Sequence, residues 1–239
     1  MFDRFGYEIG CWDLARFRQR APQDTFAAQN LQWTLLPDVW PGNAVATGLF
    51  TSWLPYDEAD SFLEVGCGAG VTAVTAALRG CSRVCALDIS PAAARNTRLN
   101  AARHGVDASM TVLTSDLFSG LGQSDRFDLI YWNSPYAEAP ADHRYETPLE
   151  YAVFDADYAM HRRYFADAPR HMTDGARLFL GFSETIGNSG RLGELAAEAG
   201  FTASVYRREV FSVALDVPGL PASDGETELD YVLYEFRQA

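Results

Sequence analysis

The chain of 239 residues contains no lysine, so its 19 basic residues are all arginines, set against 32 acidic residues. The formal net charge is −13 and the pI is near 4.6. Nucleic-acid-binding proteins cluster Lys and Arg to neutralise phosphates, whereas the arginines here are scattered along the chain. A nucleic-acid partner is therefore not expected, while an acidic surface favours solubility and can attract cationic ligands.

Cysteine and long apolar runs are also scarce. The four cysteines (Cys11, Cys67, Cys81 and Cys85) show no CxxC spacing, and the histidines show no spacing typical of metal ligands. No stretch approaches the roughly 18 uninterrupted apolar residues that cross a bilayer, and Met1–Phe5 lacks the apolar core of a secretion signal. These absences predict a cytoplasmic protein with reduced cysteines, no metal and no membrane association.

The chain divides into two segments by composition. Residues 1–55 are rich in aromatic residues and interrupted by prolines, which predicts helical pieces and loops that form a short lid over one edge of the rest. Tyr7 and Trp12 in this segment could close over a cationic ligand, although simple packing explains them equally well. Residues 56–239 alternate strands and helices, the pattern of a parallel sheet with crossover helices.

The alternation is regular enough to place individual elements. A helix starting at Pro91, after Ser90, should end at Gly105, and a second helix should end at Gly200. A further helix is predicted near Phe154–Ala168, after a loop with two prolines. The predicted strands are Ser61–Val65, Ser82–Leu87, Ala108–Thr114, Phe127–Trp132, Ala176–Phe182 and an antiparallel pair, Phe201–Val210 and Leu229–Phe236. The sequence thus predicts an α/β fold with a seven-stranded, mostly parallel sheet.

A glycine-rich turn follows the first predicted strand. Gly66, Gly68 and Gly70 would let the backbone approach a ligand closely, at the N-terminus of the next helix. The dinucleotide pattern G-x-G-x-x-G needs glycine at position 71, where Val71 stands, so a nicotinamide or flavin site is disfavoured. Instead, an acidic residue, Glu64, precedes the first glycine by two positions.

Two further acidic residues follow the next two predicted strands. Asp88 lies 20 residues after Gly68 and could accept hydrogen bonds from both ribose hydroxyls of a nucleotide. Asp116 could accept a hydrogen bond from an adenine amine, with Leu117 packed on the ring, although a turn residue explains Asp116 equally well.

This arrangement resembles the class I S-adenosylmethionine-dependent methyltransferases. Their acidic residue and G-x-G-x-G turn are matched by Glu64, Gly66, Gly68 and Gly70, and their later acids by Asp88 and Asp116. The resemblance covers about residues 60–210 and implies a Rossmann-like, doubly wound fold with S-adenosylmethionine as cofactor. The cofactor-binding residues that it implies are Glu64, Gly66, Cys67, Gly68, Gly70, Asp88, Ile89, Ser115, Asp116, Leu117 and Asn133.

The segment Asn133-Ser134-Pro135-Tyr136 follows the fourth predicted strand. It resembles the (Asn/Asp)-Pro-Pro-Tyr motif of HemK-like and base-modifying N-methyltransferases, with Ser134 in place of the first proline. A surface turn is the alternative reading, because Asn, Ser and Pro are common in turns. The upstream nucleotide motifs favour the catalytic reading.

The chemistry of such a motif is positioning and charge placement. The Asn133 side-chain carbonyl and the Ser134 main-chain carbonyl could accept N–H bonds from a planar nitrogen as it becomes pyramidal and positive. Pro135 would fix the turn, and Tyr136 could lie over the substrate plane or face the developing cation. Asn133, Pro135 and Tyr136 are therefore the predicted catalytic residues.

The acceptor is less well defined by the sequence. An acidic, tyrosine-containing segment at 137–157 would suit a cationic substrate, or it is an ordinary surface loop. We expect an amine, amide or guanidino nitrogen of a small molecule, since basic patches and the longer N-terminal domain of HemK-like enzymes are missing. The alternatives are a protein or peptide side-chain nitrogen, cyclisation of S-adenosylmethionine itself, and a catalytically silent nucleotide-binding module.

Overall fold

The computed structural model describes residues 4–20, 23–213 and 227–238. Its main sheet has the strand order β10-β11-β9-β6-β3-β4-β5. The strands are β3 (Ser61–Val65), β4 (Arg83–Asp88), β5 (Met110–Thr114), β6 (Phe127–Asn133), β9 (Met172–Phe182), β10 (Phe201–Val213) and β11 (Thr227–Gln238). All neighbours pair in parallel except β11, which runs antiparallel to both β9 and β10. The predicted fold class is confirmed.

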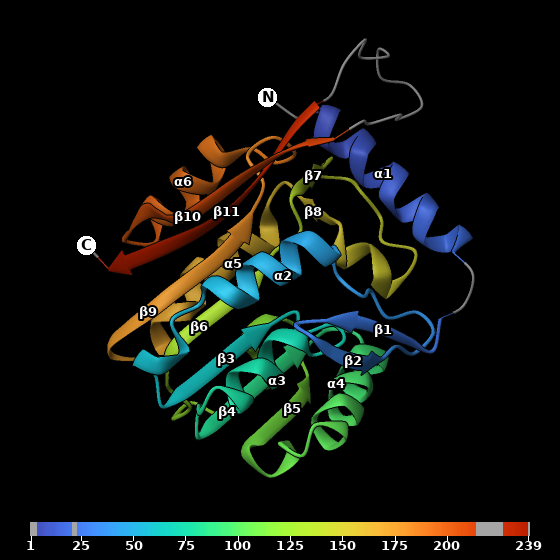
Figure 1. Cartoon of the computed structure of the whole chain (residues 1–239). Coiled ribbons are helices and arrows are strands. Elements are labelled where there is room, and N and C mark those ends of the chain that lie inside the picture. Colours follow the sequence, from blue (N-terminus) through green and yellow to red (C-terminus); the bar gives the residue numbers. More distant parts are fainter. Residues whose placement is uncertain (1–3, 21–22, 214–226, 239) are drawn as a thin grey trace.

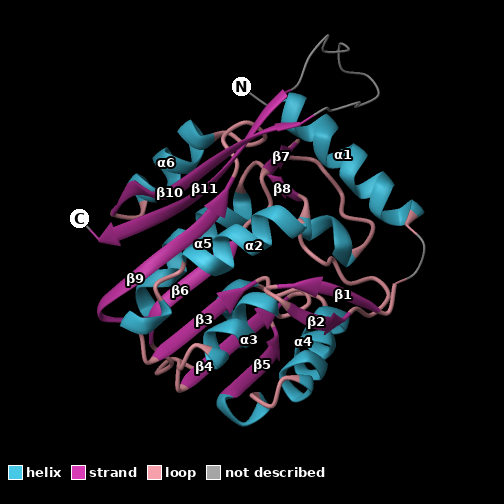
Figure 2. Cartoon of the chain, viewed as in Figure 1, coloured by secondary structure: helices cyan, strands magenta, loops and turns pink. Residues whose placement is uncertain are grey.

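Helices cover both faces of this sheet (Figures 1 and 2). One face carries α2 (Ala44–Trp53), α3 (Val71–Leu78) and α4 (Pro91–Arg103), which pack against one another in that order. The other face carries α5 (Ala159–Asp167) and α6 (Ser189–Glu198), which also pack together. No helix in the described ranges has the length and apolar character of a membrane span.

The central strands are buried on both faces. In β3, Phe62 joins the apolar cluster under α2 and α3, while Leu63 joins the cluster under α5 and α6. Tyr131 and Trp132 of β6 divide between the same two clusters. This double burial is why the strands read as nearly continuous apolar runs instead of alternating ones.

The helix ends agree with the capping signals. Ser90 caps α4, its hydroxyl accepting from the Ala93 N–H at 3.4 Å, and Pro91 occupies the first turn. Gly105 and Gly200 have left-handed backbone, with φ of +70° and +82°, where a residue without Cβ is favoured. These predicted helix stops are confirmed.

The predicted helix at Phe154–Ala168 is wrong in its first turn. Phe154–Ala156 forms strand β8, which pairs in parallel with β7 (Ala137–Ala139), and α5 starts only at Ala159. The Asp155 carboxylate accepts from the N–H groups of Met160 and His161 at 3.0 and 2.9 Å. An acceptor that satisfies these donors marks a helix start, so the helix cannot extend back through residue 155.

The N-terminal segment holds a hairpin that the sequence analysis did not predict. Helix α1 (Arg4–Gln19) contacts β7, and β1 (Thr25–Ala28) pairs with β2 (Leu31–Thr34). Gln29 and Asn30 between these strands both have positive φ, as a tight hairpin turn requires. The strands are four residues each, too short to show an alternating pattern. The division into a lid and a methyltransferase domain stays a prediction.

Candidate active site

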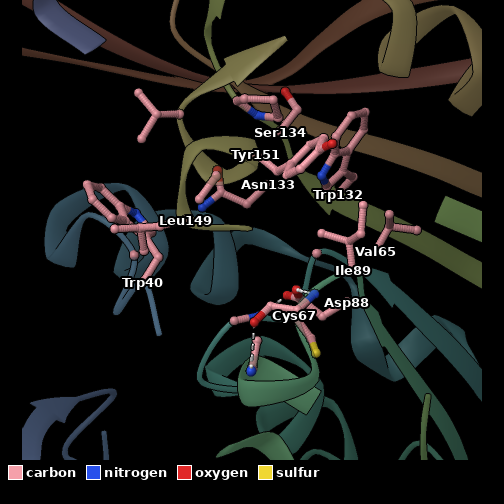
Figure 3. Close-up of a pocket in the computed structure, with 18 of the residues that line it drawn as sticks. Trp40, Val65, Cys67, Asp88, Ile89, Trp132, Asn133, Ser134, Leu149 and Tyr151 are labelled. Atoms are coloured by element: carbon pink, nitrogen blue, oxygen red, sulfur yellow. Dashed lines mark hydrogen bonds between the residues drawn. The ribbon is translucent and has the colours of Figure 1, made fainter. Parts of the chain in front are cut away.

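One cavity lies at the carboxyl edge of the parallel strands, where open α/β sheets bind ligands (Figure 3). Parallel strands end at the same edge, so loops distant in sequence meet there. The predicted site residues that line the cavity are Glu64, Gly66, Cys67, Gly68, Asp88, Ile89, Ser115, Asp116, Leu117, Asn133, Pro135 and Tyr136. Among the predicted residues, Gly70 alone does not line it.

The three glycines of the turn have different surroundings. A Cβ on Gly66 would lie 3.1 Å from the Trp132 indole nitrogen, and a Cβ on Gly68 would lie 3.1 Å from the Trp40 carbonyl oxygen. Both residues have positive φ. A Cβ on Gly70 would instead meet Thr97 of α4 at 2.8 Å. Gly66 and Gly68 therefore keep the loop close to its neighbours at the cavity, whereas Gly70 allows α3 and α4 to pack.

Glu64 lies beneath the glycine turn, where only 4% of the residue is exposed. Its Oε2 accepts from the Ala73 N–H in the first turn of α3 at 2.8 Å. Burial raises the pKa of this carboxyl group to about 8. Glu64 thus anchors the helix N-terminus behind the turn, and at neutral pH its protonated form predominates.

Asp88 joins two of the loops that form the cavity. Its Oδ2 accepts from the Gly68 N–H and its Oδ1 from the Ser90 N–H, both at 2.8 Å (Figure 3). Burial raises the pKa of the carboxyl group. Each oxygen can accept a second hydrogen bond. The predicted contact with ribose hydroxyls therefore remains open to Asp88, and it stays a prediction.

The loop after β5 is held by its own hydrogen bonds. The Ser115 hydroxyl donates to the Leu117 carbonyl at 2.6 Å and accepts from the Gly120 N–H at 2.8 Å. Leu117 is buried with φ of +47°. Asp116, half-exposed at the cavity, accepts from Arg163 at 2.9 Å. An adenine amine would share this carboxylate with Arg163.

The segment after β6 is bonded internally and to β9. The Tyr136 hydroxyl donates to Asn133 Oδ1 at 3.0 Å. The Ser134 N–H and hydroxyl both donate to the Gly181 carbonyl, at 3.3 and 3.1 Å. A proline at position 134 could make neither bond, so Ser134 gives this turn a link to β9 that the Pro-Pro form of the motif lacks.

The contacts of Tyr136 indicate a structural role that the sequence did not predict. Its ring packs edge-on against Phe182 with centroids 5.8 Å apart, and its carbonyl accepts from the Tyr158 hydroxyl at 2.8 Å. Together with the bond to Asn133, these contacts make Tyr136 a residue that orients the Asn133 amide at the cavity wall.

Residues from distant parts of the chain complete the cavity, and the sequence did not predict them. Tyr7 and Trp12 do not line the cavity: Tyr7 packs on Phe154, and Trp12 lies under Arg16. Asn43 and Tyr231 do line the cavity, and the Asn43 side-chain amide donates to the Tyr231 hydroxyl at 2.9 Å. The missed residues include Ile9, Asp13, Asp38, Trp40, Asn43, Thr47, Leu149, Tyr151 and Tyr231. No local motif marks them, because only the fold brings them to the cavity.

The sheet order and the motif-lined cavity define an S-adenosylmethionine-dependent methyltransferase. Residues 37–213 match the family model for the methyltransferase small domain, and the chain belongs to this family. The predicted resemblance and the predicted cofactor are thereby confirmed. The 16S rRNA N2 G1207 methyltransferase of T. thermophilus, solved with AdoMet and guanosine, shares the fold at a TM-score of 0.61 and 15% identity, over 90% of this chain and 50% of that one.

Curated relatives share part of the sequence. The ribosomal protein uL3 glutamine methyltransferase of Bradyrhizobium diazoefficiens is 35% identical over 118 residues, which are 46% of this chain and 37% of that protein. The release factor glutamine methyltransferase of Bordetella pertussis is 37% identical over 109 residues, 44% of this chain and 39% of that protein. The chain thus spans well under half the length of these relatives.

These names correct one expectation. The relatives are named for protein acceptors and the solved neighbour for an RNA, so the prediction of a small-molecule partner, with nucleic acid unlikely, is wrong. The inference failed because net charge describes the whole surface, whereas an acceptor is selected by the few groups around the reacting atom.

Proposed function

We propose that this chain methylates the side-chain amide nitrogen of a glutamine in a protein acceptor. Two curated relatives with this acceptor support the assignment. The observation that carries it is the Asn133 carboxamide, held by the Tyr136 hydroxyl at the wall of the cavity that also contains the glycine turn and Asp88. Figure 3 shows Asn133 across this cavity from Asp88.

The cavity suits a sulfonium nucleotide. The backbone at Gly66 and Gly68 comes so close to Trp132 and Trp40 that side chains there would be crowded. Asp88 would bind the ribose, and apolar Ile89 and Leu117 would enclose the adenine. The cofactor supplies an electrophilic methyl group when bound.

The chain's own residues would promote the reaction by orienting the amide. The amide nitrogen forms a bond to the methyl carbon, the carbon–sulfur bond breaks with its electron pair staying on sulfur, and one N–H proton is released. Because the amide lone pair is delocalised, the nitrogen is a weak nucleophile. A hydrogen bond from that N–H to Asn133 Oδ1 strengthens as the nitrogen becomes positive, which lowers the barrier.

The test is methyl transfer to ribosomal proteins and release factors, with the modified residue located by mass spectrometry. We expect methylation of glutamine. Asn133→Ala should reduce turnover roughly 100- to 1000-fold while S-adenosylmethionine affinity stays within about threefold. Asn188→Ala is the matched control: it removes an asparagine that caps α6 outside the cavity and should cost about 1 kcal/mol of stability but not turnover.

Three results would contradict the proposal. The first is methylation of lysine or RNA without methylation of glutamine. The second is unchanged turnover in Asn133→Ala. The third is consumption of S-adenosylmethionine to a cyclised product in the absence of an acceptor.

A further inference from the structure

The short helix η4 (Pro148–Ala152) forms one wall of the cavity beside the catalytic segment. Pro148, Leu149, Tyr151 and Ala152 all line the cavity. Figure 3 shows Tyr151 on the same side as Asn133 and Trp132, away from Asp88 and Cys67. This wall therefore belongs to the region where an acceptor would meet Asn133.

Tyr151 presents a rigid aromatic surface there. Its ring stacks on the Tyr145 ring with centroids 4.0 Å apart and planes inclined by 6°. Tyr145 is itself fixed, because its hydroxyl accepts from the Ala156 N–H at 3.0 Å and donates to the Phe154 carbonyl at 3.4 Å. One face of the half-buried Tyr151 ring is thus covered by Tyr145, and Tyr151 itself lines the cavity.

The adjacent Glu150 holds the wall from behind. This residue is only 4% exposed, yet its Oε1 accepts from Arg18 of α1 at 2.9 Å and from the Thr147 hydroxyl at 3.3 Å. Its Oε2 accepts from the Glu146 N–H at 3.2 Å. A wall fixed before the acceptor arrives loses little conformational entropy on binding.

We propose that Tyr151 is a specificity-determining residue that packs its ring against a planar carboxamide presented to Asn133. Tyr145 and Glu150 are positioning residues that hold the ring in place. This inference rests on the proposed function and narrows it, because it states how an amide is preferred. A flat aromatic face packs well on a planar group, whereas an extended aliphatic amine offers it much less contact.

Kinetic constants for a glutamine-containing acceptor test this role directly. Tyr151→Leu should raise KM about tenfold with a smaller change in kcat, and S-adenosylmethionine affinity should stay within about threefold. Tyr151→Phe keeps the ring and should retain the wild-type KM within about threefold. Tyr206→Leu is the matched control, because Tyr206 is a half-buried tyrosine of β10 outside the cavity. An unchanged KM in Tyr151→Leu overturns the proposal.

Positioning by Tyr145 has its own readout. Tyr145→Leu should raise KM without lowering kcat, and Tyr145→Phe, which preserves the stacked ring, should restore most of the wild-type KM. A fall in kcat with unchanged KM would show that Tyr145 acts elsewhere.

A binding experiment decides the role of Tyr151 even if glutamine proves not to be the acceptor. Benzamide, a planar carboxamide, is titrated into the protein saturated with S-adenosylhomocysteine and followed by ligand NMR. We expect wild type and Tyr151→Phe to bind it alike, and Tyr151→Leu to bind it about tenfold more weakly. Equal binding by wild type and Tyr151→Leu would refute the inference, whereas a missing glutamine product alone would refute only the proposed function.

Discussion

The two halves of the cavity are built in different ways. The half where we propose that the cofactor binds, the cofactor half, is lined by residues 64–69, 88–90 and 115–117, at the ends of three consecutive parallel strands and in the loops that follow them. The half where we propose that the acceptor binds, the acceptor half, is lined by residues from both ends and the middle of the chain: Ile9, Gly10, Asp13, Asn43, residues 133–136, Pro148, Leu149, Tyr151, Ala152 and Tyr231. The first half follows from strand order alone, whereas the second depends on how helix α1, η4 and β11 pack around β6.

The halves also differ in how their polar groups are satisfied. In the cofactor half, oxygens of buried carboxyl groups accept from backbone N–H groups, as those of Glu64 and Asp88 do. In the acceptor half, side chains hold one another, as in the Tyr136–Asn133 and Asn43–Tyr231 pairs. Substitutions in the cofactor half should therefore change cofactor affinity. Substitutions in the acceptor half should change turnover or the acceptor KM.

After Asn133→Ala, Asp88→Asn should have the largest effect. It should change the affinity for S-adenosylmethionine much more than the acceptor KM. The amide group cannot accept from both the Gly68 and Ser90 N–H groups, and losing a charge-assisted bond costs about 1.5–3 kcal/mol. S-adenosylmethionine affinity measured by calorimetry should fall about 10- to 100-fold, with acceptor KM changed less than about threefold. A larger change in acceptor KM than in cofactor affinity would contradict the assignment of Asp88 to the cofactor half.

Glu64 should make the stability of the cofactor half depend on pH. Its pKa is raised to about 8 in the folded chain from an ordinary 4.5, so the folded chain binds more protons between these values. The free energy of unfolding should therefore fall as pH rises through this window. Urea denaturation should show wild type losing on the order of 4 kcal/mol relative to Glu64→Gln between about pH 5 and about pH 8.5. Parallel profiles for the two proteins would show that Glu64 does not titrate as described.

Gly68→Ala probes the place where the glycine turn meets Trp40. The new methyl group would lie 3.1 Å from the Trp40 carbonyl and would add left-handed strain of about 1–2 kcal/mol. Gly200→Ala carries the same kind of strain at φ +82° but meets nothing within 4 Å. Thermal unfolding should shift alike in both variants, while only Gly68→Ala should weaken S-adenosylmethionine binding, by about tenfold. Equal affinities would mean that this approach does not shape the cofactor site.

Ser134→Pro should have the smallest effect and tests the catalytic segment itself. It removes both donors to the Gly181 carbonyl, and the free energy of unfolding should fall by about 1 kcal/mol. Turnover should stay within about threefold, because Asn133 and Tyr136 keep their bond. Ser134→Ala removes only the hydroxyl and so isolates the contribution of the hydroxyl to the free energy of unfolding. A large loss of turnover in Ser134→Pro would show that the β9 link orients Asn133.

Local signals predicted a feature well where its cause lies within a few residues. The strand ends, the glycine turn and the Ser90–Pro91 helix start all have such causes. The prediction failed at Asp155, which lies in the short strand β8 while its carboxylate accepts from N–H groups in the first turn of α5. Nothing nearby in the sequence distinguishes such an acceptor from a residue inside a helix. It also failed at the Gln29–Asn30 hairpin, whose strands are too short for a periodic pattern.

The amino-acid order alone determined the sheet, the loops at its carboxyl edge, and Asn133 as the candidate polar group beside a cofactor. Tertiary structure decided which side chains surround that group: Tyr136 orients it, Ser134 ties it to β9, and Tyr151 faces the cavity over a fixed ring. The physical reason is the distance along the sequence between the residues that interact. Hydrogen bonding and apolar periodicity along a strand are set by neighbours in sequence, whereas a pocket wall is set by which distant surfaces are buried together.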